Sequence, residues 1–304
     1  MELRLALIGA GFIGKSHALA MHAVDRVFPR RGLRCRPYII AEADEARARA
    51  AADALGFPEW TTSWEQAIDR ADAVVIAVPS ALHRAIAARK PLLCEKPVGL
   101  SSQEASELAA AAAAAGVSNA VGFTYVRAPM VQHAKALLAS GKLGKPVHFT
   151  GRHVEDYLAD AEAPHSWRLS RDTAGRCGAL GDLGCHILSI ARELCGPIAG
   201  LVGTARTVHA RRPIAAGASA TKPVENEDYA SAMLRFADGT PGLIETSRVA
   251  HGRKMDLSFE LTCERGTIRF EAERLNELKL YLAGEDAANA GFRTILVNPL
   301  GITS

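Results

Sequence analysis

The sequence predicts an α/β protein with a doubly wound parallel sheet, followed by an α+β domain with a mostly antiparallel open sheet. Apolar runs alternate with helical patterns along residues 1–122, which is the order of a parallel sheet with helices on both faces. A glycine-rich turn joins the first run to the first helix. Along residues 123–304 the strand-like segments instead follow one another through Asp-Gly and Arg-Gly turns, which join antiparallel strands.

In the first domain, residues 3–8 form an apolar run, interrupted by Arg4 and closed by Gly9, the pattern of a strand buried on both faces. A helical pattern follows over residues 13–23. Ser101-Ser-Gln-Glu104 predicts the start of a later helix and Gly116 its end, because serine caps a first turn and glycine favours a last one. Further strands are predicted at residues 36–41, 73–78, 91–94 and 117–121.

In the second domain, apolar residues at helical spacing predict helices near residues 130–140 and 183–194. The Ala237-Asp-Gly239 and Glu264-Arg-Gly266 turns predict hairpins between the segments that flank them. The predicted strands are at residues 146–154, 229–236, 242–249, 255–262, 267–271 and 278–282.

Composition excludes several classes of protein. The net charge of +3 is spread along the chain, so we expect no nucleic-acid partner. No run approaches the ~18 continuous apolar residues of a membrane span. The six cysteines are scattered among apolar or small neighbours, which predicts free thiols and a cytoplasmic location. We expect the short basic cluster Arg211-Arg212 to be a solvated loop.

The first turn reads Gly9-Ala10-Gly11-Phe12-Ile13-Gly14, between an apolar strand and a helix. In this context Gly9 permits the tight turn, Gly11 lets the backbone approach a pyrophosphate, and Gly14 lets helix and strand pack closely. The N–H groups at the start of the helix, from Phe12 and Ile13 onward, are suited to bind phosphate. These features predict a Rossmann domain that binds a nicotinamide dinucleotide.

An acidic residue is expected at the end of the second strand, and Glu42 stands there. A carboxylate at this position accepts hydrogen bonds from the adenine ribose and repels a 2′-phosphate. Ala43 follows it, with no arginine to bind phosphate, so we predict NAD over NADP. Asp44 is the alternative residue for binding the ribose. Glu42 could also be a solvated acid in the first turn of a helix, with no role in cofactor binding.

Three separated motifs carry candidate chemistry. Glu95-Lys96-Pro97 ends a predicted strand at its carboxyl edge, where doubly wound folds bind ligands. Asp182 and His186 are four residues apart, so on a helix they share a face. A lysine with an Asp/His pair can handle a proton while a hydride leaves carbon. The pair could also be a helix-surface pair or half of a metal site, but no third ligand stands at metal spacing, so we predict no metal.

With these motifs in order, the sequence resembles the glucose–fructose oxidoreductase / inositol dehydrogenase (Gfo/Idh/MocA) family along nearly its whole length. The resemblance implies that Lys96 hydrogen-bonds substrate and cofactor ribose, that His186 takes the hydroxyl proton, and that Asp182 orients the substrate. It also implies that residues near the nicotinamide include Pro79, Ser80, His83 and Glu95. His17 matches a position that is often histidine in the family, and the alternative for it is a cap or packing role.

The resemblance implies a polyhydroxylated substrate, since family enzymes mostly act on sugars, inositols and their derivatives. The segment over residues 155–168 is most similar to members that act on anhydrosugars such as levoglucosan. A polar pocket for several hydroxyls is expected from Tyr125, Arg152, Trp167 and Arg168. The sequence thus predicts an NAD-dependent dehydrogenase of a CH–OH group. The alternatives are an NAD-using glycosidase of the same fold and a non-catalytic dinucleotide-binding regulator.

The sequence departs from the family pattern at several places. The segment between His83 and Glu95 is short, so we expect a shortened helix there. The chain ends soon after the last predicted strand, so the second domain is expected to be truncated, with an apolar sheet face left for a dimer or tetramer to bury. Val126 and Ser189 stand where arginine and aspartate are common in the family, so we expect some substrate contacts to differ from those of other members.

Overall fold

The computed structural model describes residues 2–29, 32, 34–78, 82–284, 286 and 288–298. The chain forms two compact units, and the boundary between them lies between Gly122 and Phe123. None of the helices within these described ranges is long and apolar enough to cross a membrane.

The first unit is built on a parallel sheet, whose strands are β1 (Glu2–Ile8), β2 (Arg34–Ala41), β3 (Glu59–Thr61), β4 (Ala73–Ile76), β5 (Leu92–Cys94) and β6 (Asn119–Val121). Their order in the sheet is β3-β2-β1-β4-β5-β6, and every neighbouring pair is parallel. The order reverses between β1 and β4, the point where doubly wound sheets bind ligands beyond the carboxyl ends of their strands. The predicted doubly wound sheet is confirmed.

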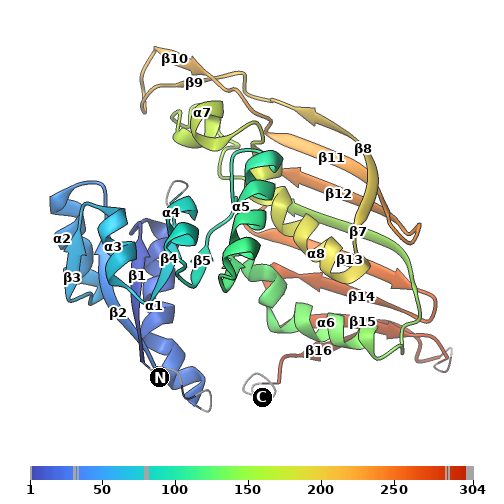
Figure 1. Ribbon diagram of the computed structural model, residues 1–304. Helices are drawn as coiled ribbons and strands as arrows, with labels where there is room; N and C mark the ends of the chain where they lie inside the picture. The colour runs from blue at the N-terminus through green and yellow to red at the C-terminus, as the bar shows by residue number, and fades with distance from the viewer. Residues whose placement is uncertain are drawn as a thin grey trace. The chain divides into compact units, whose positions relative to one another are not determined.

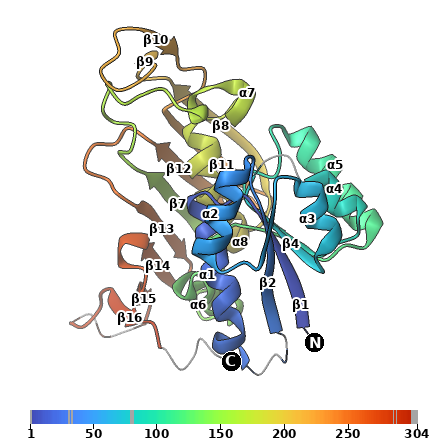
Figure 2. The ribbon, with the colours of Figure 1, turned by 90° about the vertical axis from the view of Figure 1, so that its left-hand side faces the viewer.

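Helices cover both faces of this sheet, and they are α1 (Phe12–Val27), α2 (Glu45–Leu55), α3 (Trp64–Arg70), α4 (Leu82–Ala87) and α5 (Ser102–Ala115). α1 and α2 pack on one face, against Leu5 and Leu7 of β1 (Figure 2). α3, α4 and α5 pack on the other face, where Ala6 and Ile8 of β1 are buried. Because alternate residues at the end of β1 are buried in opposite cores, its sequence is continuously apolar from Leu5 to Ile8.

Local signals determine where the helices of this unit begin and end. Ser101 Oγ accepts the N–H of Glu104 at 3.1 Å, and Gly116 ends α5 with a φ of 63°, as the sequence predicts. The Glu104 carboxylate returns to the N–H of Leu100, not to that of Ser101. α4 has only six residues, in agreement with the expected shortening of this crossover.

The second unit is built on a mixed sheet, whose strands are β7 (Pro146–Val154), β8 (Ile198–Arg206), β11 (Tyr229–Phe236), β12 (Pro241–Ser247), β13 (Asp256–Cys263), β14 (Gly266–Glu271), β15 (Glu277–Leu282) and β16 (Arg293–Leu296). Their order is β16-β15-β14-β13-β7-β12-β11-β8, and only β7 and β12 pair in parallel. Both predicted hairpins form, so the mostly antiparallel sheet is confirmed. A separate hairpin joins β9 (Arg211–Pro213) and β10 (Thr221–Pro223).

Two helices, α6 (Pro129–Ala139) and α8 (Cys185–Cys195), lie along one face of this sheet (Figure 1). At Gly151 of β7 a Cβ atom would lie 2.6 Å from Ile187 Cδ1, so the glycine lets α8 approach the strand closely. Odd-numbered residues of β7 from Phe149 to His153 therefore face α8. The remaining short elements are η2 (Thr124–Arg127), η3 (Trp167–Leu169), α7 (Arg171–Ala174), η4 (Leu180–Gly184) and η5 (Ala272–Arg274).

The prediction that Arg211-Arg212 is solvated is wrong for Arg212, which is fully buried. Its guanidinium donates to the backbone carbonyls of Leu158 at 2.5 Å and Asp160 at 2.6 Å. A buried arginine is tolerated when carbonyl oxygens satisfy its N–H groups. Arg212 therefore fixes the loop that follows β7, which carries candidate substrate-binding residues.

Candidate active site

The glycine turn between β1 and α1 has the geometry needed to hold a pyrophosphate. Gly9 has a φ of 94°, which glycine adopts without strain. At Gly14 a Cβ atom would lie 2.0 Å from the carbonyl oxygen of Gly9, so only glycine allows helix and turn to meet. At Gly11 a Cβ atom would meet nothing within 4 Å, which leaves the backbone open to an incoming phosphate. Phe12 is 90% exposed beside this opening at the start of α1.

Glu42, just after β2, reaches back to the glycine turn. Its Oε1 accepts the backbone N–H of Ala10 at 2.5 Å, and its side chain is 8% exposed, so it is not a solvated acid. Asp44 instead caps α2 by accepting the N–H of Arg47 at 2.9 Å. The Arg47 guanidinium lies 3.3 Å from Glu42 Oε2. This arginine lies one turn into α2, whereas the preference for NAD was predicted from Glu42 and the residue that follows it.

The Glu95-Lys96-Pro97 segment follows β5 at the carboxyl edge of the sheet. Glu95 Oε1 lies 2.8 Å from His17 Nε2 on α1, and Glu95 Oε2 accepts the Lys96 backbone N–H at 3.3 Å. His83, another predicted cofactor residue, is an exposed residue of α4. Pro79 and Ser80 lie outside the described residues. The glycine turn, Glu42, His17 and Glu95 thus form one connected group in the first unit.

In the second unit, Asp182 lies in η4, a short π-type turn that runs directly into α8. Its Oδ2 accepts hydrogen bonds from Tyr157 Oη at 2.8 Å and from Arg168 Nε at 3.2 Å. The Arg168 guanidinium also stacks over the ring of Trp167, with 4.6 Å between the guanidinium carbon and the ring centroid. Burial and the neighbouring Asp182 carboxylate raise the pKa of Tyr157, so the phenol remains a hydrogen-bond donor.

His186 lies in the first turn of α8, is 7% exposed and is surrounded by rings. The Tyr125 ring meets it edge-on at 4.8 Å between centroids, and the Phe123 ring does so at 6.2 Å. The structure therefore brings Tyr125 to His186, as the sequence argument expects, and it brings Trp167 and Arg168 to Asp182. An imidazole held among rings in this way has a fixed orientation toward any hydroxyl it meets.

His153 of β7 is a neighbour of His186 that the sequence argument missed. The two rings are 5.7 Å apart, and His153 is 1% exposed. Its Nδ1 donates to the carbonyl of Leu183 at 3.0 Å, and its Nε2 lies 3.1 Å from Glu155 Oε1. These two contacts, one at each ring nitrogen, fix the orientation of the His153 ring. The alternation of residues along β7 was the available signal, since it places His153 on the face of the sheet that bears α8.

A second missed residue, Glu227, anchors the turn that carries Asp182. Its Oε1 accepts the backbone N–H groups of Gly178 and Leu180, each at 2.8 Å. A carboxylate on the first N–H groups of a helical segment is favoured by both hydrogen bonding and the helix dipole. The adjacent Asp228 is fully buried and is paired with Arg248 at 2.9 Å, which holds this loop rigidly.

Arg152 does not join the group around Asp182 and His186, contrary to expectation. Its neighbour His153 faces α8, so the Arg152 side chain points to the opposite face of the sheet. There its guanidinium lies 2.8 Å from Asp256 Oδ2. The structure therefore pairs Arg152 with Asp256 and does not bring it to Asp182 and His186.

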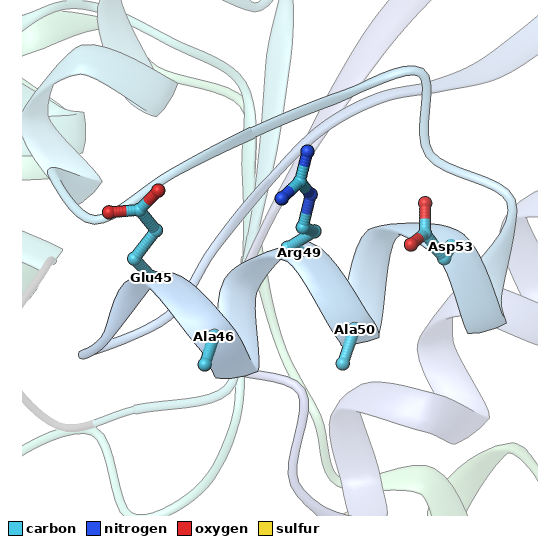
Figure 3. Close-up of a pocket in the computed structure, with 5 residues that line it drawn as sticks. All are labelled: Glu45, Ala46, Arg49, Ala50 and Asp53. Carbon is cyan, nitrogen blue, oxygen red and sulfur yellow. The ribbon is translucent and has the colours of Figure 1, made fainter.

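A shallow hollow lies on the surface of α2, and its lining includes none of the candidate site residues described above. Figure 3 shows the side chains of Glu45, Arg49 and Asp53 extending from successive turns of the helix, with Ala46 and Ala50 beside them. All five residues are exposed and none is a predicted site residue. Within the part of the chain that the structure describes, no group of three His, Cys, Asp or Glu side chains is placed to hold a metal ion.

Two family models match this chain. The model described as "Oxidoreductase family, NAD-binding Rossmann fold" matches residues 3–123. The model described as "GFO/IDH/MocA C-terminal domain" matches residues 131–269. The first covers the unit with the glycine turn, and the second includes both Asp182 and His186.

Named relatives agree with these matches. Levoglucosan dehydrogenase of Pseudarthrobacter phenanthrenivorans is 35% identical over 317 residues, which cover 98% of this chain and 81% of the relative. A solved levoglucosan dehydrogenase in complex with NADH and levoglucosan is 34% identical, with a TM-score of 0.94 over 100% of this chain and 83% of that one. D-xylose 1-dehydrogenase [NADP(+)] of Haloarcula marismortui is 28% identical over 202 residues, 63% of this chain and 54% of the relative. The chain therefore belongs to the Gfo/Idh/MocA family of NAD-binding oxidoreductases.

Proposed function

We propose that this protein is an NAD-dependent dehydrogenase that oxidises a hydroxyl group of an anhydrosugar, and that related sugars or cyclitols are the alternative substrates. The observation that carries the proposal is the Asp182 carboxylate, held by Tyr157 and Arg168 one turn before the buried His186. In this proposal Asp182 is the orienting acid, Tyr157 and Arg168 are hydrogen-bond donors from the loop after β7, and His186 is the imidazole base.

Each residue has a definite role in the proposed reaction. NAD, when bound, supplies the acceptor for the hydride that leaves the carbinol carbon. His186 takes the hydroxyl proton as general base. Lys96 is the electrophilic partner, which donates a hydrogen bond to the substrate and to the cofactor ribose. Asp182 fixes the direction of a neighbouring hydroxyl, while Tyr125, Trp167 and Arg168 line the substrate.

The preference for NAD over NADP rests on Glu42. Its buried carboxylate is fixed by the N–H of Ala10 at the end of β2, where it can accept hydrogen bonds from ribose hydroxyls. A 2′-phosphate at this position would meet that negative charge at close range. Arg47 favours the phosphate, but it is already paired with Glu42 at 3.3 Å.

An anhydrosugar is the proposed substrate because of what similar proteins are named to act on. Levoglucosan dehydrogenase matches nearly the entire length of this chain in both sequence and structure. The residues of the loop after β7 also supply the aromatic and polar side chains, Tyr157, Trp167 and Arg168, that a compact polyhydroxylated ring requires.

The test is a comparison of wild type with Lys96→Ala, with the exposed Lys142→Ala as control. Levoglucosan and a panel of sugars and inositols are offered with NAD, and NADH is followed by absorbance. We expect NADH from wild type and from the control, and a loss of about 10³-fold or more in Lys96→Ala with NAD binding retained. Sugar release without net NADH would identify a glycosidase, and NAD binding without any turnover would identify a regulator.

We also propose that two copies associate through the sheet of the second unit, in a cytoplasmic dimer or tetramer. Val202, Met233 and Leu243 are neighbours across β8, β11 and β12 and are 49–61% exposed. A contiguous apolar row on an open sheet favours burial by a second copy. All six cysteines are free, as expected for a reducing compartment. Light scattering of wild type and Met233→Glu tests the association, and identical monomeric masses would contradict it.

A further inference from the structure

A hydrogen bond joins the dinucleotide helix α1 to the segment that carries Lys96. His17 Nε2 and Glu95 Oε1 are 2.8 Å apart, although the residues are 78 positions apart in the sequence. Both side chains are largely buried, at 12% and 13% exposure. Because a carboxylate can only accept, the imidazole Nε2 is the donor when Glu95 is ionised.

The Glu95 carboxylate is confined on several sides. Its Oε2 accepts the backbone N–H of Lys96 at 3.3 Å. At Gly122, which follows β6, a Cβ atom would lie 2.5 Å from Glu95 Oε1 and 2.8 Å from its Cδ. Any side chain at position 122 would therefore displace the carboxylate. The carboxylate fits where it does because the neighbouring residue is glycine.

The other end of the pair is equally fixed. His17 lies one turn beyond Gly14 on α1, and Gly14 is held against the carbonyl of Gly9. A movement of His17 thus requires a movement of the glycine turn. The hydrogen bond therefore connects the phosphate-binding turn to the backbone of Lys96 through two buried side chains.

We infer that His17 and Glu95 are a positioning pair, which holds the Lys96 backbone in a fixed place relative to the dinucleotide helix. This inference rests on the proposed role of Lys96 in hydride transfer. A catalytic group must be held within about 0.5 Å of its productive position, and buried hydrogen bonds to its own backbone provide this restraint. The pair itself transfers no proton and contacts no reacting atom.

The experiment compares His17→Ala, His17→Gln and His22→Ala. His22 is a matched control on the same helix, since its Nε2 donates to the carbonyl of Leu55 at 2.8 Å, away from β5. Glutamine is the conservative variant because its amide nitrogen can occupy about the position of the imidazole Nε2. For each variant the measurements are kcat, KM for levoglucosan, the dissociation constant of NAD, and the melting temperature.

We expect His17→Ala to lower kcat about tenfold to a hundredfold, with the NAD dissociation constant changed less than about threefold. His17→Gln recovers most of this loss, and His22→Ala resembles wild type in kcat. Equal kcat in wild type and His17→Ala overturns the inference. An equal loss of kcat in His22→Ala also overturns the inference, and so does a loss of kcat that persists in His17→Gln. Either result indicates a general structural effect.

A second readout does not depend on turnover. The lysines are reductively methylated with ¹³C-formaldehyde, and the Lys96 signal is assigned by its absence in Lys96→Arg. We expect this signal to shift in His17→Ala and to stay in place in His22→Ala. An unmoved signal overturns the positioning role. Wild type without NADH formation on any substrate refutes the proposed dehydrogenase, and the methylation spectra then still decide whether the pair positions Lys96.

Discussion

The Tyr157 hydroxyl donates a hydrogen bond of 2.8 Å to Asp182 Oδ2, across 25 residues of sequence. This bond connects the loop after β7 to the turn that begins the α8 segment. Arg212, buried beneath the loop, holds the backbone of Leu158 next to this tyrosine. The orientation of Asp182 is thus determined from the loop as well as from its own helix.

Tyr157→Phe should lower kcat/KM about tenfold, because a hydrogen bond to a charged group contributes about 1.5–3 kcal/mol and this one is partly exposed. The melting temperature should change little, since the ring remains. The measurement is steady-state kinetics on the substrate found in the NAD assay, with Tyr281→Phe on β15 as the control. A variant as active as the control would show that Asp182 is oriented without Tyr157.

Glu227→Ala should reduce both stability and activity. Two charge-assisted hydrogen bonds to the backbone of Gly178 and Leu180 are lost, which costs about 3 kcal/mol in the free energy of unfolding. Release of the turn should also lower kcat at least about tenfold. Glu225→Ala is the matched control, because Glu225 binds the N–H of Arg171 instead. Urea denaturation measures the loss of stability, and steady-state kinetics measures kcat. An unchanged kcat in Glu227→Ala would show that Glu227 does not position the site.

Glu42→Ala should shift the cofactor preference toward NADP by about tenfold or more, because it removes a buried negative charge and leaves Arg47 available to a 2′-phosphate. Adding Arg47→Ala should abolish the gain. Asp44→Ala serves as control, since Asp44 only caps α2 and its loss costs about 1 kcal/mol of stability. The dissociation constants of NAD and NADP are measured by fluorescence titration, and an unchanged ratio in Glu42→Ala would refute the assignment.

Asp72 should make a small, pH-dependent contribution to stability. Hydrogen bonds from the side chain and backbone of Arg4 lower the pKa of Asp72 from 3.8 to about 2. The folded pKa is below the unfolded one, so the stabilisation is present above pH ~4 and is lost as the pH falls toward ~2. Asp72→Asn should therefore cost about 0.5 kcal/mol at pH 7, as expected for an exposed pair, and less at pH 3. Urea denaturation at both pH values checks this, with the exposed Asp53→Asn as control, and a constant difference would contradict it.

The elements of the fold that could be predicted are those that a local sequence pattern marks. β1 and β7 were predicted nearly to the residue, and for β1 a mostly apolar run closed by Gly9 marks the strand. β3 has only three residues, and every residue of β8 is at least partly exposed, so neither carries such a pattern. The parallel pairing of β7 with β12 joins segments about ninety residues apart, and no local signal specifies it.

The site was predicted less completely because most of its contacts are long-range. The glycine turn and Glu42 follow from local rules, whereas the pairing of Glu42 with Arg47 depends on side-chain direction in α2. Arg152 and His153 are adjacent on β7. Arg152 was predicted to bind substrate, but the side chain that faces α8 is that of His153. The carboxylate of Glu227 lies about fifty residues from the backbone it caps, so only the folded chain shows it.

The fate of a labelled hydride tests the proposed dehydrogenase activity most directly. Levoglucosan deuterated at its carbon atoms is incubated with the protein and NAD, and the NADH formed is analysed by mass spectrometry. Hydride transfer from carbon predicts NADH that carries one deuterium, formed in proportion to the oxidised sugar, with no such product from Lys96→Ala. Unlabelled NADH, or sugar consumption without net NADH, would contradict the central claim.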